Sequence, residues 1–489
     1  MPIASGESEI VQWTIRALLK FYEPVVLLKA LNIAARETAI SATANELSNT
    51  RDPVELYRAF VYKLAHVCDN VIGGATITAF MILRSDSGGV QYYFASNQRS
   101  QEQLNVTQEY VTKLLRRVKD FSSRSSDSNL VHDEVLQLVL LFNQQRLSVY
   151  LKRLKFHARE CLANPSALDT NDKAVVTSSI IGFLKSSRLE TPLPTVGLEF
   201  VDRCEELLKQ VSMLSKSPAG ALIQAQARQG RMPGYRSQAC WSEFQHTLSR
   251  ILAYPESVKF LRKAQKTWPI LFDNYEITPI PSSKPIPRPS REKSQTASAI
   301  VGRMTREQKK INIFREYVGT LQNFDLDARI QQEWRKESFR PIVHAEIVLL
   351  DWLERNGSVT TQRFFNNWKY IGGSKPTCKL CHYYFESHGS KIEHRPSHGN
   401  LYISWRFPDV FIVQGEEAKK ARQTMMDRVL AKIRVDAFEL VEQKVPPSYK
   451  DHDSNTFSAM VTLQDRLTIE ERSTDGMDIV TCLMEKATL

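Results

Sequence analysis

One predicted β-hairpin constrains the fold of this chain more than any other feature of its sequence. Residues 75–83 (ATITAFMIL) and 90–96 (VQYYFAS) are rich in β-branched and aromatic side chains, and a Ser- and Gly-rich turn separates them. A hairpin alone is only marginally stable in water, so these strands need further strands beside them. Because the flanking segments have helical periodicity, those strands have to come from elsewhere in the chain.

The composition is that of an ordinary globular protein. The length of 489 residues suggests two or three domains, and the 42% of hydrophobic residues can fill sizeable cores. The first residues lack the basic start and apolar stretch of a secretory signal, and the chain has no run of about 18 apolar residues. Seven scattered cysteines are typical of a reducing compartment. We therefore expect a soluble intracellular protein, cytoplasmic or nuclear, without a membrane segment.

Outside the hairpin the pattern is mainly helical. Asp52 followed by Pro53 is typical of a helix start and predicts a helix to about Cys68. Five prolines in residues 277–303 predict a stiff, polar connector. We divide the chain into a helical N-terminal segment (1–72), the hairpin (73–97), a helical region (98–276), a proline-rich linker or loop (277–303), a C-terminal domain (304–442) and an acidic tail (443–489).

Charge is spread unevenly along the chain, whose formal net charge is +11. Residues 308–435 hold 21 Lys and Arg against 14 Asp and Glu, a net charge of +7. Residues 436–489 hold 5 against 11, a net charge of −6. The basic segment favours an anionic partner such as a nucleotide or a nucleic acid. Ordinary solvated helix faces are the alternative, because no dense run of Lys and Arg stands out.

The strongest chemical signal is the only Cys-x-x-Cys pair of the chain, Cys378 and Cys381. A helix is predicted to begin at this pair. The i, i+3 spacing puts both sulfurs on one face, and the helix N-terminus favours thiolates. His344, at the start of another predicted helix, adds an imidazole. Two thiolates and one imidazole leave a tetrahedral zinc ion with one open position, as in catalytic rather than structural sites.

A glutamate accompanies this histidine in a His-x-Glu motif, His344 and Glu346. The motif alone carries little information, because His132 and Glu134 form a second copy with no cysteine nearby. Residues two apart on a regular helix point in different directions. Glu346 can therefore act beside a metal held by His344 only in the first turn of a helix.

The order of these motifs resembles the cytidine-deaminase-like superfamily, whose signature is H-x-E followed by P-C-x-x-C. The segments that carry the resemblance are HAE (344–346), SKPTCKLC (374–381) and RPSHGNLYISWRFPDV (395–410), and they look like a branch that has many fungal members and long helical regions. The resemblance implies an α/β fold with a three-layer α/β/α core and a large, mostly helical N-terminal portion or insertion. One departure is Thr377, which separates Pro376 from Cys378 and lengthens the loop before the metal helix.

The resemblance also implies a place for the hairpin. Deaminase sheets begin with an antiparallel strand pair before the H-x-E helix, and the residues just upstream of His344 contain no such pair. We therefore expect the hairpin to share one sheet with the short strand predicted at residues 368–371. Asn97 then resembles the asparagine that many deaminases present to the nucleoside. The alternative is a separate N-terminal domain with its own small sheet.

A zinc finger is the competing interpretation of the two cysteines. With His394 and His398 they have the spacing of a C2H2 finger. Against it, Pro396 interrupts the segment that would have to be a continuous helix. A C2H2-type interaction module and a catalytically inactive deaminase-like domain are the alternatives to an enzyme.

We predict a zinc-dependent hydrolytic deaminase that acts on a nucleobase in a nucleotide or a nucleic acid. The resemblance implies that His344, Cys378 and Cys381 hold Zn²⁺ and that Glu346 is the catalytic acid and base. Candidate substrate-binding residues are Asn97, His398, Asn400, Trp405 and Arg406, and Tyr402 is a further candidate for the lining of the base pocket. Core packing is the alternative for Trp405, and a surface salt bridge is the alternative for Arg406. A protein partner of the helical region stays open, as does the oligomeric state.

Overall fold

The five strands of the computed structural model form one mixed sheet in the order β3-β2-β1-β4-β5. They are β1 (Thr78–Arg84), β2 (Val90–Ser96), β3 (Tyr275–Ile280), β4 (Tyr370–Gly373) and β5 (Glu393–His394). The structure describes residues 9–35, 52–85, 88–121, 128–164, 170–191, 197–229, 239–290 and 294–443. The predicted acidic tail (443–489) lies outside the described residues, apart from residue 443.

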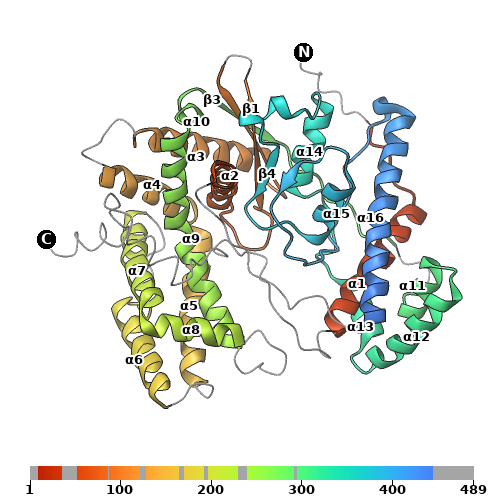
Figure 1. Cartoon of the computed structure of the whole chain (residues 1–489), viewed down its shortest axis with the longest axis horizontal. Helices are drawn as coiled ribbons and strands as arrows, with labels where there is room; N and C mark the ends of the chain where they lie inside the picture. Colours follow the sequence, from red (N-terminus) through yellow and green to blue (C-terminus); the bar gives the residue numbers. More distant parts are fainter. Residues whose placement is uncertain are drawn as a thin grey trace.

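The hairpin obtains its partners from two distant segments. β1 and β2 pair antiparallel over their whole length, from Thr78 opposite Ser96 to Arg84 opposite Val90. β4 joins the other edge of β1, antiparallel, and β5 follows parallel to β4. β3 adds a parallel strand beside β2. β1 of the hairpin thus pairs with β4, the strand expected near residues 368–371, although the whole helical region lies between them in the chain (Figure 1).

Helices cover both faces of the sheet. Alternate side chains of β1 therefore enter two different hydrophobic clusters. Met81 and Leu83 of β1 belong to one hydrophobic cluster, and Phe80 and Ile82 belong to the other. The predicted three-layer α/β/α architecture is therefore confirmed. We call the layer on the side of Met81 the metal-side layer, and the one on the side of Phe80 the opposite layer.

The metal-side layer combines the N-terminal helix with the helices of residues 297–443. Its helices are α1 (Ile15–Ala35), α11 (Ala297–Met304), α12 (Gln308–Gln322), α13 (Leu326–Arg335), α14 (Ala345–Arg355), α15 (Lys379–Ser387) and α16 (Gly415–Gln443). α1 and α16 lie side by side on the right of Figure 1. The proposed segment 1–72 is thus split, because α1 packs on this side of the sheet and the next helix on the other.

The opposite layer continues into the helical region. It is formed by α2 (Pro53–Cys68), α3 (Gln101–Lys119), α4 (Ser128–Phe142), α5 (Gln144–Ala163), α6 (Thr170–Ser186), α7 (Leu198–Lys216), α8 (Pro218–Gln229), α9 (Ala239–Thr267) and α10 (Ile270–Asp273). As predicted, Asp52 caps α2 and Pro53 opens it. Among the described helices none is long and apolar enough to cross a membrane.

A buried ion pair ties the helical region to the centre of the fold. Arg146 of α5 lies 2.6 Å from the Asp69 carboxylate just after α2, and both side chains are almost fully buried. The same carboxylate accepts hydrogen bonds from Thr76 and from Ser374, the residue after β4. Removing one partner of such a pair costs about 3–5 kcal/mol, so this link fixes α5 against the sheet.

Among the described residues of the predicted linker or loop at 277–303, only the middle part is a loop, because both of its ends belong to regular elements. Residues 277–280 belong to β3, where Pro279 is tolerated because β3 is an edge strand of the sheet. Residues 297–303 belong to α11. Between them, Ser282 donates a hydrogen bond to the Ser96 carbonyl, and Ser283 accepts one from the Val343 amide. The segment is therefore bonded to β2 and to the approach of α14.

Candidate active site

Two helices begin at the candidate metal ligands. His344 has extended backbone angles (φ −71°, ψ 153°) and is the N-cap of α14, so Glu346 lies in the first turn, as the spacing requires. Cys378 is the N-cap of α15, and its sulfur accepts a hydrogen bond from the Cys381 amide at 3.4 Å. Both helix N-termini thus contribute positive partial charge where thiolates would form.

The three side chains have the separations of zinc ligands. His344 Nδ1 lies 3.5 Å from Cys378 Sγ and 3.4 Å from Cys381 Sγ. The ligand atoms of the three residues all lie within 4.8 Å of one another, and no other group of this kind occurs among the described residues. Tetrahedral coordination with ordinary Zn–S and Zn–N bonds puts sulfur and nitrogen about 3.5 Å apart. The donor set therefore fits a zinc ion.

The electrostatics of this cluster favour a thiolate at Cys378. Burial opposes its ionisation, but the hydrogen bond from Cys381 and the neighbouring His344 lower the pKa of the Cys378 thiol well below its usual value. Burial and the charge at Cys378 raise the pKa of Cys381. Burial alone would lower the pKa of His344, but the negative Cys378 raises it overall. The cluster is arranged to hold a positive charge.

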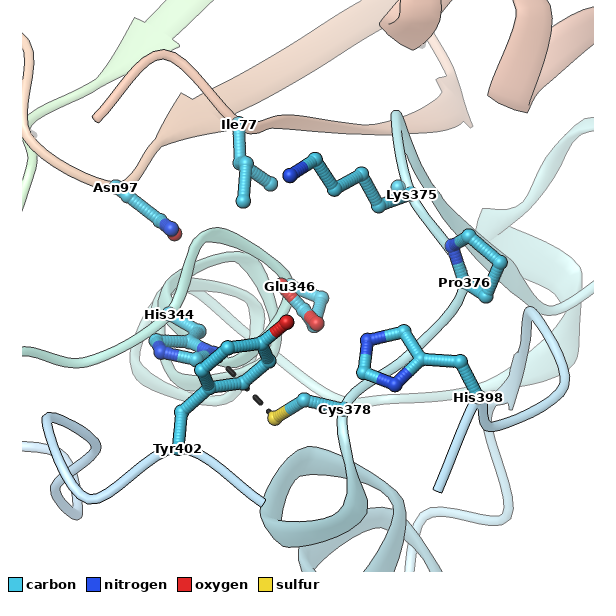
Figure 2. A pocket seen from close by; sticks show the side chains of 10 residues that line it. Ile77, Asn97, His344, Glu346, Lys375, Pro376, Cys378, His398 and Tyr402 are labelled. Carbon is cyan, nitrogen blue, oxygen red and sulfur yellow. Dashed lines mark hydrogen bonds between the residues drawn. The ribbon is translucent and has the colours of Figure 1, made fainter. Parts of the chain in front are cut away.

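A small pocket opens beside the cluster (Figure 2). Its lining residues are Ile77, Asn97, His344, Glu346, Gly373, Lys375, Pro376, Cys378, His398 and Tyr402. Glu346 is partly buried in the pocket wall, and burial raises the pKa of its carboxyl group, against the opposing effect of His344. The cavity measures about 30 Å³, which is room for at least one water molecule beside Glu346 and the candidate ligands.

Asn97 lies in the pocket wall, but its amide already has protein partners. Its Oδ1 accepts a hydrogen bond from the Ala345 amide at 2.9 Å, and its Nδ2 donates one to the Gly74 carbonyl at 3.0 Å. Ala345 is the first residue of α14, whose N-cap side chain points to the cysteines instead of capping the helix. Asn97 therefore supplies the cap that His344 does not.

His398 also lines the pocket, and Figure 2 shows its ring directed toward Glu346. Its Nδ1 accepts a hydrogen bond from the Asn400 amide at 3.0 Å. Asn400 itself does not line the pocket; its carbonyl accepts a hydrogen bond from the Lys379 amide and so holds the segment after β5 against the start of α15.

Trp405 and Arg406 do not line the pocket either. Trp405 is completely buried behind the candidate metal ligands, and its indole Nε1 donates to Cys381 Sγ at 3.2 Å. Arg406 is buried as well; its guanidinium pairs with Asp409 at 2.6 Å and donates to the Lys284 carbonyl at 3.0 Å. Trp405 therefore packs in the core, as its alternative predicts, and Arg406 forms a salt bridge, although a buried one.

The zinc-finger arrangement is not formed. His394 lies in β5, where its Nε2 is 3.1 Å from Nδ1 of His382, and it is not part of the group around the cysteines. His398 follows Pro396 in a segment without helix. The His344 imidazole takes the place beside the cysteines that a finger would give to these two histidines.

Two of the other lining side chains, those of Ile77 and Lys375, do not follow from the motifs as candidates, whereas Tyr402 does. Ile77 precedes β1, and no local pattern marks it. Lys375 is the second residue of the SKPTCKLC segment, so its closeness in sequence to Cys378 could have marked it as a candidate. Tyr402 lies in the segment after β5, and its hydroxyl points into the pocket in Figure 2.

The α/β/α fold and the His-Cys-Cys cluster with a neighbouring glutamate define a deaminase-like protein. Residues 343–409 match the model of the OTT_1508-like deaminase family, which places this part of the chain in the cytidine-deaminase-like superfamily. No curated protein and no solved structure gives a significant match to the chain. The fungal branch within the superfamily stays a prediction.

Proposed function

We propose that this protein is a zinc-dependent hydrolytic deaminase of nucleobases. The observation that carries the proposal is the position of Glu346, a carboxyl group in the wall of the same pocket as His344 and Cys378. A structural metal site has no need of such a group. The match of residues 343–409 to a deaminase family supports the same conclusion.

His344, Cys378 and Cys381 would hold the zinc ion, with its fourth position facing the pocket. Bound zinc supplies Lewis acidity, which makes a water molecule nucleophilic near neutral pH. The helix N-termini at His344 and Cys378 and the indole of Trp405 orient the ligands.

Glu346 would move the protons of the reaction. Its carboxylate accepts a proton from the attacking water and delivers it to the ring nitrogen of the base, next to the carbon that bears the amino group. A C–O bond forms at this carbon, the second proton of the same water passes through Glu346 to the amino group, and the C–N bond breaks to release ammonia and leave a carbonyl. Burial of Glu346, which raises its pKa, suits a group that both accepts and donates.

We propose a phosphate-bearing substrate, either a nucleotide or a nucleic acid. Residues 308–435 carry a net charge of +7, and Lys375 places an ammonium group at the pocket itself. Cytosine and adenine are the candidate bases, because both carry an exocyclic amino group on a ring carbon next to a ring nitrogen.

The experiment is an assay of ammonia release by the full chain with cytidine and adenosine, their monophosphates, single-stranded DNA and RNA. We expect release from at least one phosphate-bearing member, and none from the same substrate with Glu346→Ala. If the wild-type protein contains zinc but is as inert as Glu346→Ala on the whole panel, the catalytic assignment is wrong and the site is a zinc-stabilised binding module.

A further inference from the structure

The indole of Trp405 contacts one of the candidate metal ligands. Its Nε1 lies 3.2 Å from Cys381 Sγ, within hydrogen-bond distance of a sulfur acceptor. Trp405 has no exposed surface, and neither does Cys381. Because water has no access to this side of the sulfur, the indole N–H is a fixed donor to it.

The main chain holds Trp405 in this position. Ile342 pairs with this segment as in a parallel sheet, since its amide donates to the Ser404 carbonyl and its carbonyl accepts from the Arg406 amide. The Trp405 carbonyl accepts a hydrogen bond from the buried Tyr22 hydroxyl of α1 at 2.9 Å. An N-terminal helix is thus connected to the site through the residue that contacts Cys381.

Aromatic packing fixes the indole ring as well. The ring centroids of Phe21, Tyr384 and Phe407 lie 5.9, 6.1 and 4.8 Å from that of Trp405. Such contacts are typical of tilted and edge-to-face aromatic pairs. The indole therefore cannot turn its N–H away from the sulfur without displacing the core between α1 and α15.

We infer that Trp405 is a positioning residue of the metal centre. Its N–H···S hydrogen bond orients the Cys381 thiolate and withdraws part of its charge, and Tyr22 of α1 supports it from behind. Partners of metal ligands commonly change metal affinity by 10- to 100-fold when they are removed. The inference rests on the proposed zinc site, and it assigns Trp405 a role behind the metal instead of at the substrate.

The chain offers a matched control in Trp334 of α13. Trp334 is 1% exposed, and its Nε1 is buried without a hydrogen-bond partner among the described residues. Trp334→Phe and Trp405→Phe remove the same indole N–H from a buried site and keep an aromatic ring, but only Trp405→Phe removes a donor to sulfur.

The experiment measures metal affinity by chelator competition and the thiolate-to-metal absorption of the Co²⁺-loaded full chain. We expect Trp405→Phe to weaken metal binding about 10- to 100-fold and to shift the absorption band, with no change in Trp334→Phe. If Trp405→Phe unfolds cooperatively like the wild type and equals Trp334→Phe in both readouts, the inference is overturned. If wild-type protein binds no metal, the proposed function fails first.

A second measurement on the wild-type protein covers the case in which Trp405→Phe does not fold. In the ¹¹³Cd-loaded full chain, a hydrogen bond to a metal-bound sulfur transmits a scalar coupling from the metal to the indole proton. We expect a correlation between ¹¹³Cd and one indole proton. Cadmium bound without such a correlation overturns the inference.

Discussion

The chain contains the His-x-Glu motif twice, and the two copies have different surroundings. His344 is the N-cap of α14, so its side chain and that of Glu346 in the first turn both line the pocket. His132 lies within α4, where it is buried, whereas the Glu134 side chain is 42% exposed and pairs with Arg117 of α3. The same three-residue pattern thus gives a site in one place and ordinary helix packing in the other.

The difference shows that backbone position decides what the motif can do. Inside a helix, residues two apart are rotated by about 200° around the axis, so His132 and Glu134 cannot face one cavity. At a helix start the N-cap has extended backbone angles, which lets His344 and Glu346 converge. The cysteines at the start of α15 then complete the first copy only.

Metal content gives the largest expected contrast between the two copies. We predict that His344→Ala and Cys378→Ala lose the zinc of the wild type, because two remaining ligands hold it poorly. His132→Ala should keep the zinc and lower the free energy of unfolding by about 0.5–3 kcal/mol, as substitutions of buried residues do. Elemental analysis measures the zinc content, and urea denaturation measures the free energy of unfolding.

A further variant, His394→Ala, separates the deaminase arrangement from the zinc finger. It should keep the zinc, because His394 contacts His382 and not the cysteines. Loss of zinc in His394→Ala with retention in His344→Ala would contradict the account.

Turnover gives the second contrast. Glu346→Gln should keep zinc and lower kcat by about 10²- to 10⁴-fold, because it removes the proton acceptor and keeps the size of the side chain. Glu134→Gln should leave kcat unchanged, since it removes only a partly exposed ion pair with Arg117. Steady-state ammonia release measures both. Equal effects of the two substitutions would show that the position at the helix start is irrelevant to the chemistry.

The sequence predicts the hairpin and β4 but neither β3 nor β5. The hairpin and the need for partner strands follow from composition, and β4 begins two residues later than expected. The prolines of residues 277–303 predict a loop where β3 is formed. An edge strand tolerates Pro279, and only the pairing of β3 with β2 makes this segment an edge strand. Within the helical region, the buried Asn143 separates α4 from α5, and its Nδ2 donates a hydrogen bond to the Val67 carbonyl.

The positions of His344 beside Glu346 and of Cys378 beside Cys381 are predictable because the spacing within each motif fixes its geometry at a helix start. The resemblance, and not the spacing, joins the two motifs. The direction of side chains in the segment after β5 is not predictable in this way, because it depends on pairing with Ile342, more than fifty residues upstream in the chain. That pairing buries Trp405 and Arg406, which have the residue types of a base-binding site. The spacing within the motifs thus predicts the candidate ligands. The pairing of distant segments decides which side chains surround them.

Stability gives a third and smaller contrast, at the start of α14. Asn97→Ala should lower the free energy of unfolding by about 1 kcal/mol, since the Ala345 amide loses the cap that His344 cannot provide. Asn105→Ala, at an exposed position of α3, should change it by less than about 0.5 kcal/mol. Urea denaturation of the two variants compares them, and equal effects would mean that Asn97 does not cap the helix.

Salt dependence gives the smallest expected effect. With a nucleic-acid substrate, KM should rise about threefold for each phosphate contact between 50 and 200 mM salt. KM for a nucleotide should rise less, through screening alone, and KM for a free nucleoside should stay constant. Lys375→Gln should weaken this dependence, and Lys391→Gln, which lies outside the pocket, should not. Steady-state kinetics at several salt concentrations measure the salt dependence of KM for the wild type and both variants. A salt response that is the same for nucleoside and nucleotide would argue against a phosphate contact.

The central claim is that one histidine and two cysteines hold zinc and leave a position open to the pocket. X-ray absorption at the zinc edge of the purified full chain tests it directly. The account predicts two sulfur neighbours at about 2.3 Å, two lighter neighbours at about 2.0 Å and the scattering of one imidazole. Two imidazoles or four sulfurs around the zinc would contradict it.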